Sequence, residues 1–225
     1  MKNFLKRITL YILNNCLRKS KILTWLLFQV KVNDYPRIHW DFTTIILKHC
    51  LKRCVRHSSS VLEIGTGPYA VLAIYLSKKI GCKISAADIL TDFIRNAKIA
   101  AELNHISINL FQSDLFSQVH NSYDLIFFNS VYIPENQGLK LGLDKLHRDK
   151  TEWCGGPDGL NTIDEFLHQA QNHLHPAGKI LLGFNPHYLP LNNVPACADN
   201  YNYNIIKIYR KKFNPCRILI LERKP

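Results

Sequence analysis

The chain has 225 residues, 47% of them hydrophobic and 20% charged, which is enough for one compact domain with a substantial core plus an extension. Its net charge of +12 is concentrated at the front, where residues 1–60 hold 12 Lys or Arg against two Asp or Glu. This distribution excludes a uniformly basic body. Phosphate-bearing partners or an anionic membrane surface are candidates for the front segment, and a solvated helix face is the structural alternative.

Seven cysteines, an odd number without a dense pattern, favour free thiols in a reducing compartment over a disulfide framework. Cys50 and Cys54 lie one helical turn apart with His49 and His57 nearby. Because no second ligand cluster has a matching spacing, we expect a buried helix face here and no metal site. The N-terminal apolar stretch ITLYIL is too short for a signal peptide, and no run approaches the roughly 20 apolar residues that span a bilayer. We therefore expect a cytoplasmic protein.

Apolar periodicity predicts a helical front followed by alternating strands and helices. Leu5, Ile8, Ile12 and Cys16 indicate amphipathic helices within residues 3–30, and a further helix is expected over residues 41–56. Expected strands cover residues 61–65, 83–88, 106–112, 123–128 and 178–184, and expected helices cover 68–81, 91–104 and 160–174, with Thr91 as a cap. The last two strands, 203–212 and 214–223, should form a hairpin with a tight turn.

This alternation predicts an α/β fold with a Rossmann-like, seven-stranded, mostly parallel sheet and a C-terminal antiparallel hairpin. We expect a basic helical extension over residues 1–57 and the sheet domain over residues 58–225. Ligands of such sheets bind beyond the carboxyl ends of the strands, and the motifs below all fall at such ends.

Two glycines after the first expected strand mark a ligand-binding loop. Gly65 and Gly67 permit a sharp turn and a close approach of the backbone to a ligand, and the following helix N-terminus favours an anionic group. With Ala70 and Asp88 the spacing also suits a dinucleotide fingerprint. Glu63 favours a ligand with a cationic amino group instead, such as the methionine part of S-adenosylmethionine.

Acidic residues at the next two strand ends extend this site. Asp88 can accept both ribose hydroxyls, and Asp114, beside Ser113, can accept from the adenine amino group. A strand-end carboxylate or a turn cap explains each residue singly, but three acids at three successive strand ends favour S-adenosylmethionine. The predicted cofactor site also includes Thr66, Ile89, Leu115 and Asn129.

The motifs LEIGTG, AAD and SDLF and the terminal hairpin resemble, in order and spacing, the class I S-adenosylmethionine-dependent methyltransferases, from about Tyr35 to the C-terminus. YDLIFFNSVYIP and the GG-x-DGL loop are most similar to the branch with release-factor and ribosomal-protein glutamine N-methyltransferases and some adenine N6-methyltransferases. The resemblance implies S-adenosylmethionine as cofactor and a protein glutamine, or an RNA or DNA adenine, as acceptor. The loop residues are Gly155, Gly156, Asp158, Gly159 and Leu160.

Amide and exocyclic amine nitrogens are poor nucleophiles because their lone pairs are delocalised. Accepting hydrogen bonds from both N–H groups orients the lone pair at the methyl group. The family does this with Asn-Pro-Pro-Tyr; carried over, Asn129 is the side-chain acceptor, Ser130 supplies a carbonyl and Tyr132 is the aromatic platform. Ser130-Val131 replaces both prolines, so the loop loses stiffness. Three alternatives follow: other contacts hold the loop, the acceptor has changed, or the loop is purely structural.

A second stretch, FNPHYLP at residues 184–190, follows the fifth strand, where Asn185, His187 and Tyr188 could line the acceptor pocket. We hypothesise that His187 binds or deprotonates the substrate; a structural role is the alternative. The stretch DYPRIHWDFTT is similar to the lead-in of the glutamine-modifying enzymes, whose preceding region recruits a large substrate.

The front segment could therefore contact RNA, a ribosome-associated protein or a membrane surface, or act as a lid. Rival functions are a small-molecule methyltransferase, a non-catalytic S-adenosylmethionine-binding protein and, more remotely, a nicotinamide dehydrogenase.

Overall fold

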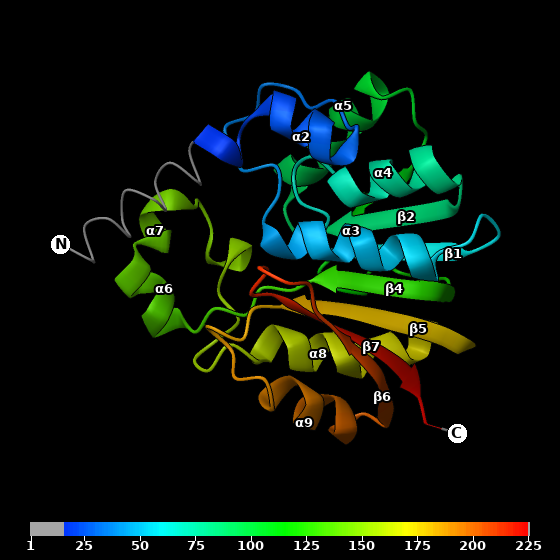
Figure 1. Cartoon of the computed structure of the whole chain (residues 1–225), viewed down its shortest axis with the longest axis vertical. Helices are drawn as coiled ribbons and strands as arrows, with labels where there is room; N and C mark the ends of the chain where they lie inside the picture. Colours follow the sequence, from blue (N-terminus) through cyan, green and yellow to red (C-terminus); the bar gives the residue numbers. More distant parts are fainter. Residues whose placement is uncertain (1–15, 225) are drawn as a thin grey trace.

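A seven-stranded sheet forms the centre of the protein in the computed structural model, which describes residues 16–224 (Figure 1). The strand order is β3-β2-β1-β4-β5-β7-β6; β1 to β5 are parallel, and β7 is antiparallel to both of its neighbours. The strands are β1 (Ser60–Ile64), β2 (Lys83–Asp88), β3 (Asn109–Gln112), β4 (Tyr123–Asn129), β5 (Leu174–Phe184), β6 (Tyr203–Tyr209) and β7 (Arg217–Arg223). The predicted fold class is confirmed.

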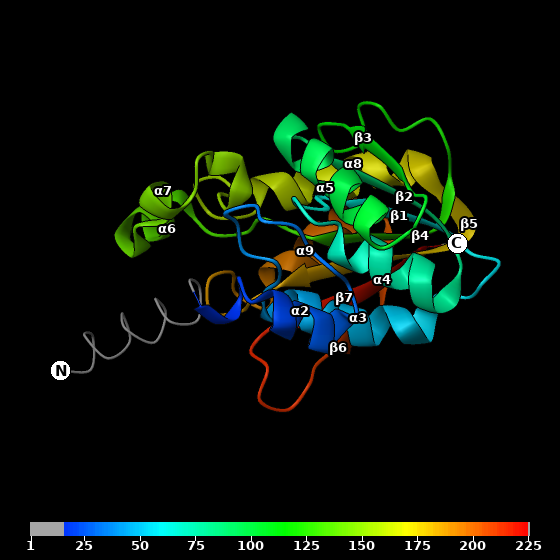
Figure 2. The ribbon, with the colours of Figure 1, turned by 90° about the horizontal axis from the view of Figure 1, so that it is seen from above.

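Helices cover both faces of the sheet (Figures 1 and 2). Side chains alternate along each strand, so Val61 and Leu125 enter one core and Leu62 and Ile126 enter the other. The first core lies under α3 (Phe42–Cys54), α4 (Val71–Ile80) and α5 (Thr91–Leu103), with α2 (Lys21–Phe28) packed against α4. The second lies under α8 (Asn161–Ala170), which continues into the 3-10 turn η3 (Gln171–His173), and α9 (Asn193–Asn200).

The described front segment packs directly on this body. Phe28, Trp40 and Leu47 are buried in the same core as the sheet residues. The Tyr69 hydroxyl donates hydrogen bonds to the carbonyl oxygens of Tyr35 and Arg37 and so fixes the segment before α3 over the start of α4. The described part of the front therefore covers the sheet; the boundary at residue 57 stays a prediction.

Three local predictions were wrong. Thr91 does not cap α5: the cap position is Leu90, whose N–H donates to Asp88 Oδ1. The strands of the hairpin are joined by a loop of seven residues between Tyr209 and Arg217 and not by a tight turn. In this loop the Asn214 side chain donates a hydrogen bond to the Phe42 carbonyl, which holds the loop against the start of α3. β5 begins at Leu174, which pairs with Tyr123 across a bulge, and not at residue 178.

An excursion between β4 and α8 was not predicted. It contains α6 (Glu135–Leu141), α7 (Leu143–Leu146) and the 3-10 turn η2 (Lys150–Glu152), and it projects beyond the body in Figure 2. The buried Trp153 ring lies where a side chain on Gly138 would have to be, so this glycine lets the excursion fold on itself. Within residues 16–224 no helix has the length and apolar character needed to cross a bilayer; the first part of the predicted front helices lies outside those residues.

Candidate active site

The two predicted loop glycines have different roles. Gly65 and Gly67 both have positive φ angles, 65° and 68°, which favour glycine. A Cβ on Gly65 would lie 2.8 Å from the Phe128 ring, so this glycine lets β1 and β4 close together at their ends. A Cβ on Gly67 would meet nothing within 4 Å. The backbone at Gly67 is therefore open to a ligand.

Glu63 organises the same loop from behind. Its side chain is buried, and Oε2 accepts from the Thr66 hydroxyl at 2.8 Å and from the Ala73 N–H, in the first turn of α4, at 3.1 Å. Burial raises the pKa of Glu63 to about 8, although the two hydrogen bonds act in the opposite direction. Glu63 thus anchors the glycine loop to α4, and its predicted contact with an amino group stays a prediction.

Asp88 joins the ends of β1 and β2. Its Oδ2 accepts from the Gly67 N–H at 2.8 Å and its Oδ1 from the Leu90 N–H at 3.0 Å. Burial raises the pKa of Asp88 to about 6. Each carboxylate oxygen keeps a lone pair for a further donor. Ile89, next in the chain, exposes 36% of its surface and offers an apolar surface beside these oxygens.

The end of β3 is shaped by Ser113. Its hydroxyl donates to the Leu115 carbonyl at 2.9 Å and accepts from the Gln118 N–H at 3.0 Å. Leu115 has a φ of 44°, so the turn is tight, and the Asp114 side chain is exposed. Ser113 shapes the turn; the adenine contact of Asp114 stays a prediction.

Asn129, the last residue of β4, presents an oxygen without a partner. Its Oδ1 is buried and finds no hydrogen-bond partner within residues 16–224, which is rare for buried polar atoms. Its Nδ2 donates to Asp41 Oδ1 at 3.3 Å. Because a carboxylate only accepts, the amide must turn its NH₂ group toward Asp41 and its oxygen away.

Sequence reasoning missed Asp41. It caps α3: Oδ1 accepts from the N–H and from the hydroxyl of Thr44, both at 2.7 Å. The sequence signal is the spacing Asp41-x-x-Thr44 at the start of a predicted helix, a capping box. The cap places its carboxylate beside the end of β4, 88 positions further along the chain.

Ser130 fastens the altered motif to β5. Both its N–H and its hydroxyl donate to the Gly183 carbonyl, at 3.3 and 2.8 Å. A proline at this position could make neither bond, because it has no N–H and no hydroxyl. The loop thus has an attachment that replaces some of the stiffness two prolines would give.

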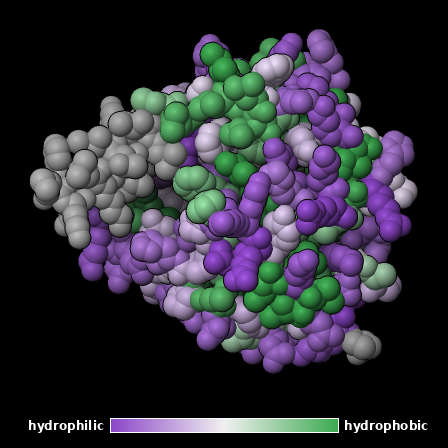
Figure 3. All heavy atoms as spheres, in the orientation of Figure 1, coloured by the Kyte–Doolittle hydropathy of each residue, from purple (hydrophilic) through white to green (hydrophobic). Residues whose placement is uncertain are grey.

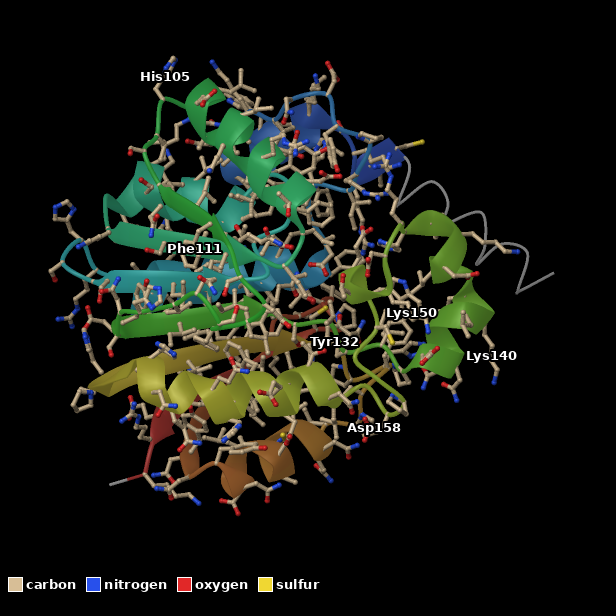
Figure 4. All side chains as sticks on the ribbon, turned by 180° about the vertical axis from the view of Figure 1, so that it is seen from behind. His105, Phe111, Tyr132, Lys140, Lys150 and Asp158 are labelled. Carbon is tan, nitrogen blue, oxygen red and sulfur yellow. The ribbon has the colours of Figure 1, made fainter. Side chains whose placement is uncertain are left out.

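Tyr132, the predicted aromatic platform, is 8% exposed, so protein covers most of its ring; its role as a platform stays a prediction. Figure 4 shows it between the strand ends and the segment that runs from η2, with Lys150, to the GG-x-DGL loop, with Asp158; Lys140 lies on the outer side of the excursion. Burial raises the pKa of Tyr132 well above its usual value.

The GG-x-DGL loop packs on the motif backbone. A Cβ on Gly159 would lie 2.4 Å from the Tyr132 carbonyl oxygen, and one on Gly155 would lie 2.6 Å from the Gly159 carbonyl oxygen. The Gly155 N–H donates to the Ile133 carbonyl at 3.0 Å. Asp158 Oδ1 accepts from the Leu160 N–H at 2.9 Å, which closes the turn before α8, and a side chain on Gly156 would meet Asn161. The glycines are therefore needed for close backbone contact.

A second cluster that the sequence did not predict links the front to the excursion. Glu152 Oε1 lies 3.3 Å from Arg37 Nη2, its Oε2 lies 3.0 Å from His147 Nδ1, and its side chain is 5% exposed. Burial is the main reason why the pKa of Asp88 is raised, and the negative charge of Glu152 raises it further. The hydrogen bonds from the Leu90 and Gly67 N–H groups lower it. Arg37 Nε is buried without a partner among the described residues.

The remaining candidates are less enclosed. His187 is exposed and packs edge-on against Tyr188, with ring centroids 4.9 Å apart, while the Asn185 side chain accepts from the His187 N–H. A pocket role for these residues stays a prediction. Within the described chain no three His, Cys, Asp or Glu side chains form a group that could hold a metal ion.

Comparison with known proteins identifies the family. Residues 28–137 match the family described as methyltransferase small domain. A putative protein N5-glutamine methyltransferase of Methanocaldococcus jannaschii is 34% identical over 67% of this chain and 74% of its own length. The release factor glutamine methyltransferase of Streptococcus pneumoniae is 27% identical over 68% of this chain, but the match spans only 55% of that enzyme.

Solved structures agree on the fold. A methyltransferase from Pyrococcus furiosus, 23% identical, covers 98% of both chains with a TM-score of 0.67. A 16S rRNA N2 G1207 methyltransferase of T. thermophilus, in complex with AdoMet and guanosine, is 17% identical and covers 86% of this chain and 46% of its own, with a TM-score of 0.61. Because the M. jannaschii relative is 34% identical over 74% of its length and the methyltransferase small domain matches residues 28–137, the chain belongs to the class I S-adenosylmethionine-dependent methyltransferases, and S-adenosylmethionine is its cofactor.

Proposed function

We propose that the protein transfers a methyl group from S-adenosylmethionine to the side-chain amide nitrogen of a glutamine in a protein. The observation that carries this proposal is the buried Asn129 Oδ1, which has no partner within the described chain and is held in one orientation by Asp41. A buried acceptor without a donor is costly unless a ligand completes it. The two N–H groups of a carboxamide are suitable donors.

The residues at the strand ends fit the cofactor. The open backbone at Gly67 permits close approach, the lone pairs of Asp88 suit ribose hydroxyls, and Ile89 offers an apolar surface for the adenine ring. Arg37 provides a buried Nε–H without a described partner, a donor suited to the carboxylate of the methionine part. When bound, S-adenosylmethionine supplies an electrophilic methyl group on a sulfonium.

The chain's own groups orient the acceptor. Asn129 Oδ1 accepts one amide N–H, and the Ser130 carbonyl accepts the other. This arrangement fixes the amide plane and favours the developing positive charge on nitrogen. The two bonds from Ser130 to Gly183 hold this carbonyl in place, so the Ser-Val substitution is compatible with N-methylation.

A glutamine acceptor is favoured over a base. A base would need a wide aromatic surface for stacking, and Tyr132 exposes only 8% of its surface. The names of the relatives from M. jannaschii and S. pneumoniae agree with a protein glutamine. Because the S. pneumoniae relative is named a release factor glutamine methyltransferase, a release factor is the first acceptor to test. We also propose a cytoplasmic location, which the seven free cysteines support because a reducing compartment keeps thiols free.

The test uses purified protein, methyl-tritiated S-adenosylmethionine and extract from cells that lack the protein, followed by separate protease and nuclease digestion. We expect label that protease releases and nuclease does not, and we expect Asn129→Ala to abolish it while cofactor binding persists. Label released by nuclease alone would show that the acceptor is a nucleic acid and would refute the glutamine proposal. Label confined to small molecules, or cofactor binding without any transfer, would refute a macromolecular acceptor.

A further inference from the structure

One face of the protein, away from the catalytic loops, combines exposed apolar side chains with an excess of positive charge. It is formed by α2, α3, β6 and the loop of residues 210–216, which lie on the same side of the molecule in Figures 1 and 2. We call it the α2–α3–β6 face. In Figure 3 apolar areas above and below are separated by a hydrophilic band.

Several large apolar side chains on this face are mostly exposed to solvent. On α2, Ile22, Trp25 and Leu26 follow the i, i+3, i+4 spacing of one helix stripe and are 72%, 50% and 61% exposed. At the other end of the face, Ile206 is 50% exposed and Phe213, on the projecting loop, is 94% exposed. Single exposed apolar residues are ordinary, but two groups on one face indicate a binding surface.

The same elements carry only positive charge. Residues 21–28, 42–54 and 203–217 contain no Asp or Glu. Their cationic residues are Lys21, Lys48, Lys52, Arg53, Lys207, Arg210, Lys211, Lys212 and Arg217. Lys21 pairs with Asp34, which lies between α2 and α3, with 2.6 Å between Nζ and Oδ1. Lys211 Nζ lies 2.9 Å from His49 Nε2, and the pKa of His49 is lowered by burial and then by Lys211 and the α3 cations. The α3 and loop cations thus face each other without a counter-charge on their own elements.

We propose that the α2–α3–β6 face binds the surface of an anionic phospholipid bilayer. The cations would contact the anionic headgroups, and the aliphatic and aromatic side chains beside them would enter the hydrocarbon boundary, a region in which Trp is common. RNA would use the cations and the two rings, but it offers nothing to Ile22, Leu26 and Ile206. Phe213, with Lys211 and Lys212 immediately before it, is placed to enter the headgroup region first.

This contact leaves the catalytic edge free. The parallel strands run across the view of Figure 1, so their carboxyl ends, with Asn129, open toward the side of the molecule and not toward the α2–α3–β6 face. Docking would therefore bring the site beside the membrane without covering it. The proposal does not depend on which acceptor the enzyme methylates.

The test is flotation of the full-length protein with phosphatidylcholine vesicles, with or without about one third phosphatidylglycerol, at low and high salt. We expect binding to the anionic vesicles only, at least tenfold weaker at high salt. Trp40 and Trp153 are buried, so an emission shift on binding reports Trp25. We expect a blue shift in the wild type that Trp25→Phe removes, because Trp25 enters the interface.

Two variants and a control decide the outcome. Phe213→Ser with Lys211→Gln and Lys212→Gln should weaken binding at least tenfold, as should Ile22→Gln with Leu26→Gln. The control is Ile99→Gln with Lys98→Gln on α5, exposed positions on another element, and should bind as the wild type does. Equal binding to neutral vesicles, no binding, or equal loss in the control would overturn the proposal. So would vesicle binding displaced by a short RNA that the wild type binds more tightly.

Discussion

The contact between Asp41 and Asn129 gives the sharpest test of the site, because Asp41 has two separable roles. It caps α3 through Thr44 and it orients the Asn129 amide. Asp41→Ser keeps an oxygen that can accept from the Thr44 N–H, but it is too short to reach Asn129. Asp41→Asn keeps a side-chain oxygen at the same distance for both partners.

The magnitude follows from the kind of bond lost. A hydrogen bond to a charged group contributes roughly 1.5–3 kcal/mol, and about 1.4 kcal/mol corresponds to a factor of ten. If that energy holds the amide in its productive orientation, Asp41→Ser should lower kcat about 10- to 100-fold. The free energy of unfolding should fall by no more than the energy of this one bond, because the cap on the Thr44 N–H survives. Asp41→Asn should keep most of the activity.

The assay is steady-state methyl transfer to the acceptor found by the labelling experiment, with cofactor affinity and urea unfolding measured on the same samples. The loss in Asp41→Ser should fall on kcat and leave cofactor binding unchanged. If Asp41→Ser transfers methyl groups at the wild-type rate, Asp41 does not orient Asn129. If activity and stability fall together in both variants, Asp41 acts only as a cap.

Four further outcomes follow from single contacts. Gly159→Ala places a Cβ against the Tyr132 carbonyl and should lower both stability and transfer, by about 1–3 kcal/mol in urea unfolding; an unchanged midpoint would contradict this packing. Glu63 has a raised pKa in the folded state, so folding takes up a proton and its contribution to stability is lost as pH rises through about 8. From pH 6.5 to 8 the wild type should lose about 1.5 kcal/mol relative to Glu63→Gln, in which the other titrations cancel, and parallel curves would refute this. Ser130→Ala removes one of two bonds to Gly183 and should cost about 1 kcal/mol in the same unfolding assay, with no loss expected only if the loop is held elsewhere. His187→Ala should reduce transfer if the histidine contacts substrate, and an unchanged rate assigns it a structural role.

Strand and helix patterns could be predicted from local sequence because each depends on near neighbours. β2 lies at the predicted residues 83–88, and the glycine loop follows β1 as its Gly-x-Gly spacing indicates. The sheet order then brings the predicted cofactor residues to one edge, since the carboxyl ends of parallel strands meet there. This part of the site could therefore be predicted from local sequence and the fold class, without knowledge of individual long-range contacts.

The remainder depends on contacts that sequence spacing does not show. Asp41 reaches Asn129 across 88 positions, and Arg37 meets Glu152 across 115. The burial of Tyr132 depends on where the GG-x-DGL loop returns, which is set by close backbone contact at Gly159. The excursion was missed because α6 and α7 are too short to give a helical period, and Trp153 closes it through tertiary packing.

The central claim is that Asn129 Oδ1 and the Ser130 carbonyl hold a glutamine amide for methylation. The most direct measurement is tandem mass spectrometry of a purified release factor after incubation with the protein and S-adenosylmethionine. The structure predicts one added methyl group on a glutamine side-chain nitrogen, absent with Asn129→Ala although that variant still binds the cofactor. A methyl group on another residue type, or equal methylation by Asn129→Ala, would contradict it.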